Sequence, residues 1–261
     1  MLWPYLLLVR AGFQRHSTYL TASVAGLFTN TVFGLLRVAV LLAVVEQTGL
    51  VAGYDAGSVS AFVWLGQGLL TVVLLWGDGE LAERVRTGDV AFDMSRPWNL
   101  QVALLAMDIG RAGHAALFRF APQIAIGALL FPFRWPEDPM TVPLFVGSVL
   151  VAIVISAQLR FMLDLTAFWL LDVRGVRTVY NAGGNLISGL TVPLAFFPDA
   201  LRAAIYATPF PAMLQTSIDV FTERDGVAWL LVNQAVWMVV LLVAARLVLA
   251  RATRKLVVQG G

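Results

Sequence analysis

The strongest constraint on the fold is a series of long apolar runs separated by short polar connections. A helix of about 20 apolar residues crosses the ~30 Å hydrocarbon core of a bilayer. Since backbone groups in lipid must be hydrogen-bonded within the protein, such runs form α-helices. The chain is 59% hydrophobic and only 13% charged, whereas soluble domains have about 25% charged residues. We therefore expect an all-α integral membrane protein, with one transmembrane domain over residues 1–261.

Six membrane-spanning helices are predicted. They cover residues 19–45, 59–76, 113–133, 142–163, 179–193 and 227–249. Residues 1–18 indicate an interfacial helix, because Trp3, Tyr5 and Phe13 suit the headgroup level of a membrane. The segment 194–211 follows a break at Pro193 and begins with charged residues, so we expect a re-entrant element of short helices that does not cross.

Basic residues predict the orientation of the chain, since cytoplasmic loops are enriched in Lys and Arg. Six spans place both termini on one side. That side carries Arg10, Arg15, Arg84, Arg86, Arg96, Arg111, Arg174, Arg177, Arg251, Arg254 and Lys255, and the other side carries Arg134, Arg202 and Arg224. This asymmetry predicts that both termini are cytoplasmic.

The largest polar segment between the apolar runs is residues 77–98. It predicts a short helix, because Leu81 and Val85 are spaced i, i+4. Asp78 is the expected N-cap residue and Gly88 the expected C′ residue. The expected ion pairs along this helix are Glu80 with Arg84 and Glu83 with Arg86.

The second half of this segment is expected to be extended. Val90, Phe92 and Met94 alternate with polar neighbours, and Pro97 ends the segment. The whole segment is either a solvated loop or a cytoplasmic docking surface, and its place in the predicted topology favours docking.

Several classes of function find no support in the sequence. The chain has no cysteine and no phosphate-binding glycine motif, and its two histidines, His16 and His114, are far apart in sequence. We therefore predict no catalytic site, no metal site and no cofactor in this chain. Dispersed arginines speak against nucleic acid as a partner and for contact with the lipid bilayer.

Charged residues inside apolar runs need a structural or functional reason. Arg37 is either a structural residue or part of the lining of a cavity. Arg160 and Asp164, spaced i, i+4, are expected to pair with each other.

A translocation path or a subunit interface is the other candidate site. Small residues at helical spacing allow close helix packing, either within the chain or between subunits. The candidate residues are Arg37, Gly184, Asn185, Ser188, Gly189, Phe196 and Phe197. Four phenylalanines, Phe28, Phe33, Phe196 and Phe197, are candidates for an aromatic wall along this path.

The chain resembles the permease subunits of bacterial ABC-2 type exporters, in the branch of paired permeases described as an uncharacterised transport system. The resemblance covers nearly the whole chain. It is carried by Glu83, Gly88, Arg96-Pro97, Ser188-Gly189, Val192-Pro193-Leu194, Phe197-Pro198 and Pro209-Phe210-Pro211.

The resemblance implies a bacterial inner-membrane permease that binds two cytoplasmic ABC ATPase subunits and a second permease, identical or related. ATP and Mg²⁺ would be bound by the ATPase subunits. The residues implied to couple the permease to the ATPase are Glu80, Leu81, Glu83, Arg84, Val85, Thr87 and Gly88. The expected function is outward transport of an amphiphilic or drug-like substrate. The alternatives are an ion-coupled secondary transporter and a non-catalytic membrane anchor.

Overall fold

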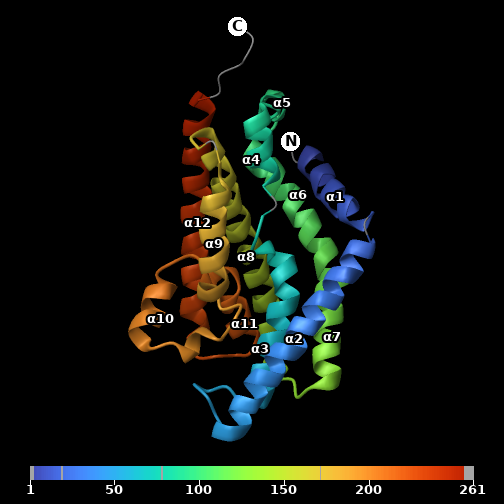
Figure 1. The fold of residues 1–261 in the computed structure, drawn as a ribbon, viewed down its shortest axis with the longest axis vertical. Coiled ribbons are helices and arrows are strands. Elements are labelled where there is room, and N and C mark those ends of the chain that lie inside the picture. Colours follow the sequence, from blue (N-terminus) through green and yellow to red (C-terminus); the bar gives the residue numbers. More distant parts are fainter. Residues whose placement is uncertain (1–2, 19, 78, 171, 256–261) are drawn as a thin grey trace.

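A computed structural model describes residues 3–18, 20–77, 79–170 and 172–255, and these residues form helices joined by short loops, with no strand among them (Figure 1). In chain order the helices are α1 (Trp3–Ser17), α2 (Leu20–Thr48), α3 (Ala56–Leu69), η1 (Leu70–Leu74), α4 (Glu80–Thr87), α5 (Val90–Ser95), α6 (Leu100–Ala115), η2 (Ala116–Phe120), α7 (Ala121–Leu130), α8 (Thr141–Leu165), η3 (Thr166–Phe168), α9 (Arg174–Ile187), η4 (Leu194–Phe196), α10 (Asp199–Tyr206), η5 (Pro211–Met213), α11 (Gln215–Phe221), α12 (Val227–Ala252) and η6 (Thr253–Lys255). The expected all-α class is confirmed.

Among the described residues, four helical segments are long and apolar enough to cross a membrane. They are Ser23–Thr48, Ala56–Leu74, Thr141–Phe168 and Val227–Lys255, and they match four of the six predicted spans. The predicted span 113–133 overlaps the second half of a continuous helical run over residues 100–130, which ends three residues before the predicted span does. The predicted span 179–193 falls on α9, which has 14 residues and is therefore only about 21 Å long. The six-span count stays a prediction.

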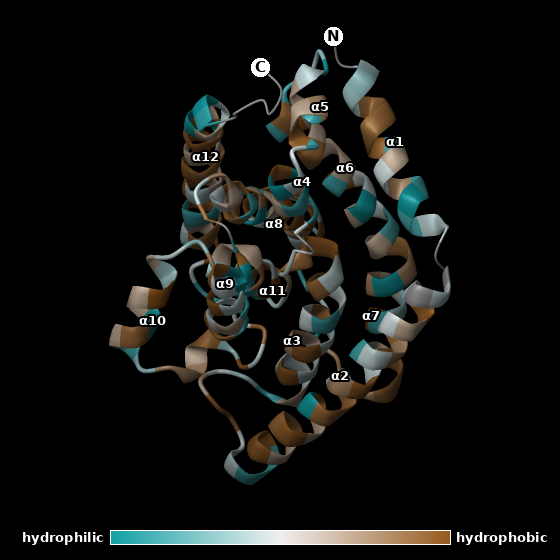
Figure 2. Cartoon of the chain, turned by 45° about the horizontal axis from the view of Figure 1, so that its top comes forward, coloured by the Kyte–Doolittle hydropathy of each residue, from teal (hydrophilic) through white to brown (hydrophobic). Residues whose placement is uncertain are grey.

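α3 lies at the centre of the helix bundle. It packs against α2, α7 and α11, and Trp64 and Leu65 are completely buried in it. The other long helices expose large apolar side chains, such as Phe28 on α2 and Val236 on α12, as expected for surfaces that face lipid. Polar residues gather at the end of the bundle formed by α4, α5 and the last turns of α12 (Figure 2). The described N- and C-terminal ends lie at this same end, whereas α10 lies towards the other (Figure 1).

The segment 90–95 differs from the prediction, because it forms the short helix α5 rather than an extended segment. The backbone N–H groups of Ala91 and Phe92 donate to the carbonyl oxygens of Gly88 and Asp89. Val90 is buried and Phe92 exposed, so the apolar alternation does not mark one face. Three alternating residues are too few to distinguish a strand from a short helix.

The helix before the predicted break also ends earlier than expected. α9 ends at Ile187, and the chain turns at Gly189, which has φ +82°, rather than at Pro193. A side chain at Gly189 would collide with Gln215, so the turn requires glycine here. Short helices then follow over residues 194–221. Their position relative to a membrane surface stays a prediction.

Candidate functional site

The predicted short helix of the polar segment is α4, Glu80–Thr87. Its N-cap is Gly79 with φ +80°, and the expected N-cap, Asp78, lies outside the described residues. A Cβ atom at Gly79 would collide with the guanidinium group of Arg177. At the other end Gly88, with φ +86°, is the C-cap and donates its N–H to the carbonyl oxygen of Val85. Glycines in the left-handed conformation therefore begin and end this helix.

α4 has a buried side and an exposed side. Leu81 is 4% exposed and lies with Val85 in an apolar cluster that also includes Phe161 of α8. On the other side, the side chains of Glu83 and Arg86 are 56% and 65% exposed and form the predicted i, i+3 ion pair at 2.6 Å. This hydrogen-bonded pair lowers the pKa of Glu83, so the charges of both residues persist at neutral pH. The exposed side is a charged surface at the polar end of the bundle.

The other two charged residues of α4 form ion pairs with neighbouring helices. Glu80 pairs with Arg15 of α1 at 3.0 Å, and Arg84 pairs with Asp93 of α5 at 2.8 Å. Both pairs are tertiary contacts, and the pairing of Glu80 with Arg84 that the spacing suggested stays a prediction. Thr87 donates its hydroxyl to Asp89 at 2.7 Å. α4 is thus attached to α1 on one flank and to α5 on the other.

A buried group of charged residues lies next to α4, at the end of the central helix. Asp108 of α6 pairs with both Arg111 and Arg160 at 2.6 Å. Arg111 also donates to the carbonyl oxygens of Thr71 and Val72, at 2.6 and 2.8 Å. These carbonyls belong to η1, where the helix from α3 stops at Leu74 in a left-handed conformation, φ +56°. The last carbonyl groups of a helix have no hydrogen-bond partner within that helix. Arg111 donates the missing hydrogen bonds to two of them.

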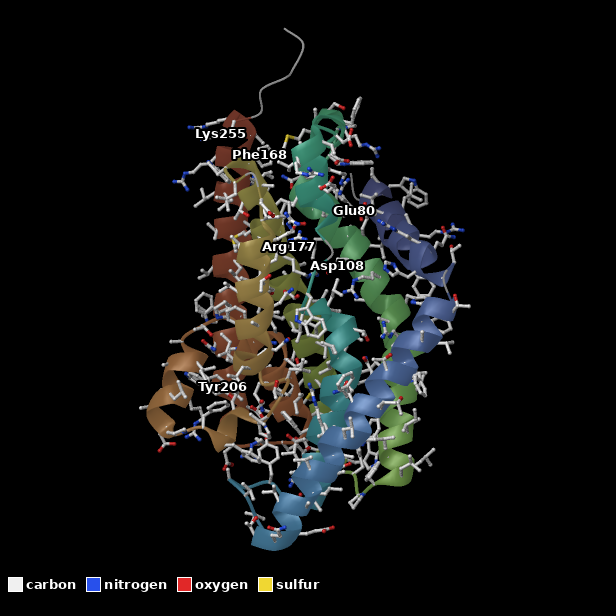
Figure 3. All side chains as sticks on the ribbon, in the orientation of Figure 1. Glu80, Asp108, Phe168, Arg177, Tyr206 and Lys255 are labelled. Atoms are coloured by element: carbon white, nitrogen blue, oxygen red, sulfur yellow. The ribbon has the colours of Figure 1, made fainter. Side chains whose placement is uncertain are left out.

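Arg160 and Asp164 each form an ion pair with a residue of another helix, and the pair between them that their spacing suggested stays a prediction. Arg160 pairs with Asp108 of α6, and Asp164 accepts from Arg177 of α9 at 2.5 Å. Glu80, Asp108 and Arg177 lie around the break between the central helix and α4 (Figure 3). Ion pairs thereby connect α4 with α1, α6 with α8, and α8 with α9.

Two hollows that are lined in part by charged residues flank α4. The first, of ≈ 490 Å³, lies between α1, α4, α6 and α8 and is lined by residues that include Glu80, Asp108 and Arg160. The second, of ≈ 720 Å³, is lined by residues that include Glu83 and Arg174. α4 therefore has a hollow on each of two sides, while its apolar side packs against α8.

Arg37 has a structural contact that the sequence did not predict in detail. Its Nη1 donates to the carbonyl oxygen of Leu190 at 2.9 Å, in the turn that follows Gly189. This contact joins α2 to the end of α9, and it agrees with the structural alternative for Arg37.

The predicted small-residue face on α9 is used within the chain. A side chain at Gly184 would come within 3.2 Å of Phe210. Asn185 accepts a hydrogen bond from the indole of Trp76 at 2.8 Å, and Ser188 is completely buried. α9 itself, which ends one residue before Ser188, has no buried residue, and its Val179 is 75% exposed. The far side of α9 therefore stays open to a partner.

The predicted aromatic wall is only partly assembled. Phe196 packs edge-on against Tyr54 with ring centroids 5.6 Å apart, and Phe197 is half-buried. Phe28 and Phe33 on α2 are 70% and 54% exposed. In the described part of the chain, no aromatic ring contact joins Phe196 or Phe197 to Phe28 or Phe33.

A buried carboxylate at the opposite end of the bundle was missed by the sequence analysis. Asp219 of α11 accepts from Gln215 at 2.8 Å, from Tyr206 at 3.2 Å and from Tyr54 at 3.5 Å. Burial raises the pKa of Asp219 to about 6. The guanidinium of Arg224 lies over the Tyr54 ring, 4.1 Å from its centroid. Because these residues are up to 170 positions apart, no local motif could have signalled this cluster.

The two histidines are close in space although distant in sequence. The ring centroids of His16 and His114 are 6.3 Å apart, and Phe13 packs edge-on against His114. Within the described residues, no group of three or more His, Cys, Asp or Glu side chains is arranged to hold a metal ion.

Comparison with known proteins identifies the family. The family model described as "ABC-2 family transporter protein" matches residues 31–260, which includes α3 to α12 and most of α2. No curated protein sequence matches the chain. The family model covers three of the four apolar helices in full, most of the first, and the α4 segment, and it confirms the resemblance found from the sequence. The chain is a multi-pass membrane protein that belongs to the ABC-2 family of ABC transporter proteins.

Proposed function

We propose that this chain is the permease subunit of an exporter driven by ATP hydrolysis in separate ABC ATPase subunits, and that α4 is the helix on which an ATPase subunit docks. Membership of the ABC-2 family supports a permease role. The observation that carries the docking assignment is the exposed Glu83–Arg86 face of α4 at the polar end of the bundle. In this proposal, two ATPase subunits hold ATP and Mg²⁺, and this chain supplies a surface rather than a catalytic site.

The ion pairs around α4 support a route by which its movement reaches the membrane. A push on α4 acts directly on α1 through Arg15–Glu80. It acts on α9 through Arg177, which packs on Gly79 and pairs with Asp164 of α8. Helices joined in this way move as rigid bodies between two packed arrangements. We infer that ATP binding and hydrolysis switch the permease between these arrangements.

The second permease is proposed to pack on the side formed by α2 and α9. Large apolar residues are exposed on both helices, including Phe28, Leu36 and Val179. Small residues at the end of α9 would allow a helix of the second permease to approach its backbone closely. The exposed aromatic residues on α2 favour an amphiphilic substrate moving along this face. Both termini and α4 would be on the cytoplasmic side of a bacterial inner membrane, and segment 194–211 would re-enter from the other side.

The docking assignment is tested by reversing the charges on the exposed face. The double variant Glu83→Arg with Arg86→Glu keeps an i, i+3 ion pair on α4 but inverts the pattern that a partner meets. We expect the reconstituted complex with its ATPase to lose most substrate-stimulated ATP hydrolysis, because reversed charges across an interface repel. The measurement is ATPase activity in liposomes, together with co-purification of the ATPase subunit.

The control is the same reversal at the opposite end of the bundle. Asp199→Arg with Arg202→Asp inverts another exposed i, i+3 pair, on α10, and should leave ATP hydrolysis unchanged. If the α4 variant retains wild-type activity and still co-purifies with the ATPase, α4 is not the docking helix. If both variants lose activity equally, the loss is not specific to α4 and the assignment is likewise wrong.

A further inference from the structure

An apolar groove runs along the outside of the bundle between the 100–130 helix and α8. It has a volume of ≈ 300 Å³, and its lining residues are all apolar, among them Val72, Ile109, Phe120, Val146 and Leu150. On the 100–130 helix it extends from Ile109 to Phe120. The eleven helical rises from Ile109 to Phe120 correspond to about 16 Å, which is about half of the ~30 Å hydrocarbon core. The groove therefore has the length of one leaflet.

A second cleft adjoins this groove, between α1 and α6. Its volume is ≈ 630 Å³, and Arg10 and Gln14 of α1 line it together with Ile109 and Gly113 of α6. Ile109 and Gly113 also line the apolar groove. The two hollows therefore meet along one edge of α6.

Backbone contact between α1 and α6 closes the base of the cleft, whereas no side chain blocks the edge that the cleft shares with the apolar groove. Side chains at Gly12 and Gly110 would collide with the backbone of the facing helix, at Met107 and Val9, so α1 and α6 are in direct backbone contact. At Gly113, by contrast, the nearest atom to an added Cβ would be a ring carbon of Phe13 at 3.8 Å. Gly113 thus leaves an open path from the α1–α6 cleft into the apolar groove.

The charge at the mouth of the cleft is the positive charge of Arg10, which is not neutralised by an ion pair among the described residues. α1 contains no acidic residue, and among the described residues Arg10 forms none of the ion pairs. Asp108 of α6 is occupied by Arg111 and Arg160. α1 also exposes Trp3 and Leu6, as a helix partly immersed in a membrane does.

We propose that one anionic phospholipid occupies this continuous groove. Its phosphate binds Arg10 and Gln14 at the α1–α6 cleft, and one acyl chain passes over Gly113 and lies against α8. A guanidinium is the side chain best suited to a phosphate, and juxtamembrane basic residues attract anionic headgroups. The apolar wall of one-leaflet length matches a single chain. This lipid would cover the seam that attaches α1 to the bundle.

The test is native mass spectrometry of the delipidated, detergent-purified full chain titrated with palmitoyl-oleoyl-phosphatidylglycerol. We expect one tightly retained lipid per chain. Gly113→Phe blocks the path and should weaken retention about tenfold, whereas Arg10→Gln removes the phosphate partner without filling space and should weaken it about fivefold. Diacylglycerol with the same chains, and dihexanoyl-phosphatidylglycerol, should each be retained less well than the full lipid.

The matched control is Gly147→Phe, on the exposed surface of α8, where nothing lies within 4 Å of an added Cβ. This variant should retain the lipid as the wild type does. Equal retention by Gly113→Phe and Gly147→Phe would overturn the proposal, as would a preference for diacylglycerol over phosphatidylglycerol. Loss of a chain dimer in Gly113→Phe, with lipid binding unchanged, would assign the groove to a second copy of the chain instead.

Discussion

At the scale of single residues, the two glycines at the ends of α4, Gly79 and Gly88, are required for different structural reasons. Gly79 and Gly88 both have positive φ, +80° and +86°, which costs a residue with a side chain about 1–2 kcal/mol. Only Gly79 also has a neighbour in the way, the Arg177 guanidinium, and nothing lies within 4 Å of a Cβ at Gly88. Sequence reasoning identified Gly88 as a helix end from local punctuation, but it could not identify the Arg177 contact.

This difference predicts unequal effects of the same substitution. Gly88→Ala should lower stability by about 1 kcal/mol from backbone strain alone, and Gly79→Ala by about 2–3 kcal/mol, because Arg177 must also move from its pair with Asp164. Thermal unfolding of the two variants in detergent measures the difference. Equal melting temperatures would show that the Arg177 contact contributes nothing.

At the scale of secondary-structure elements, the main feature is a transmembrane helix whose end is held by other helices. η1 ends the central helix at Leu74, and side chains from α6 and α8 bind its free carbonyls: Arg111 binds those of Thr71 and Val72, and Ser156 donates to that of Leu74 at 2.8 Å. The sequence showed Asp108 and Arg111 at i, i+3 spacing but not their partners. Those partners depend on which helices pack together.

Replacing Arg111 tests how much this arrangement contributes. Arg111→Gln leaves two carbonyls and part of the Asp108 charge unpaired, and we expect a loss of about 3 kcal/mol. Arg111→Lys keeps the charge, but a lysine ammonium group cannot bind both carbonyls and Asp108 at once as the planar guanidinium does. The loss of stability in Arg111→Lys should therefore lie between zero and that in Arg111→Gln. Arg202→Gln breaks an exposed pair and should cost less than about 1 kcal/mol. Chemical unfolding of the three variants in mixed micelles gives the order, and a loss no larger for Arg111→Gln than for Arg202→Gln would contradict it.

At the scale of the whole molecule, the two ends of the bundle differ in the chemistry they present. α4, α5 and both described chain ends lie at one end, and α10 lies towards the other. If basic residues set the orientation as proposed, these two ends are on opposite sides of the membrane.

Single-cysteine labelling measures this orientation, because the chain has no native cysteine. Thr87→Cys should be protected from a membrane-impermeant maleimide in intact cells and labelled after permeabilisation. Asp225→Cys, in the turn just before α12, should be labelled in intact cells. Labelling of Thr87→Cys from outside would reverse the orientation, and labelling of both positions on one side would contradict the arrangement of the bundle across the membrane.

The sequence by itself determined the class of the protein and the place of α4. Apolar runs of spanning length force helices in lipid, and the i, i+4 spacing of Leu81 and Val85 with a closing Gly88 is a local signal. These features depend on energies within about one or two helical turns, so they can be read without knowing the fold.

Only the tertiary structure decided which charges meet and where the chain turns. Asp108 pairs with Arg160, Arg177 packs on Gly79, and Gly189 rather than Pro193 ends the α9 segment against Gln215. Val90–Ser95 is helical where alternation predicted an extended segment. Each of these outcomes depends on which helices pack side by side, since the free energy of a buried charge or of a close glycine contact is set by neighbours that are distant in the sequence.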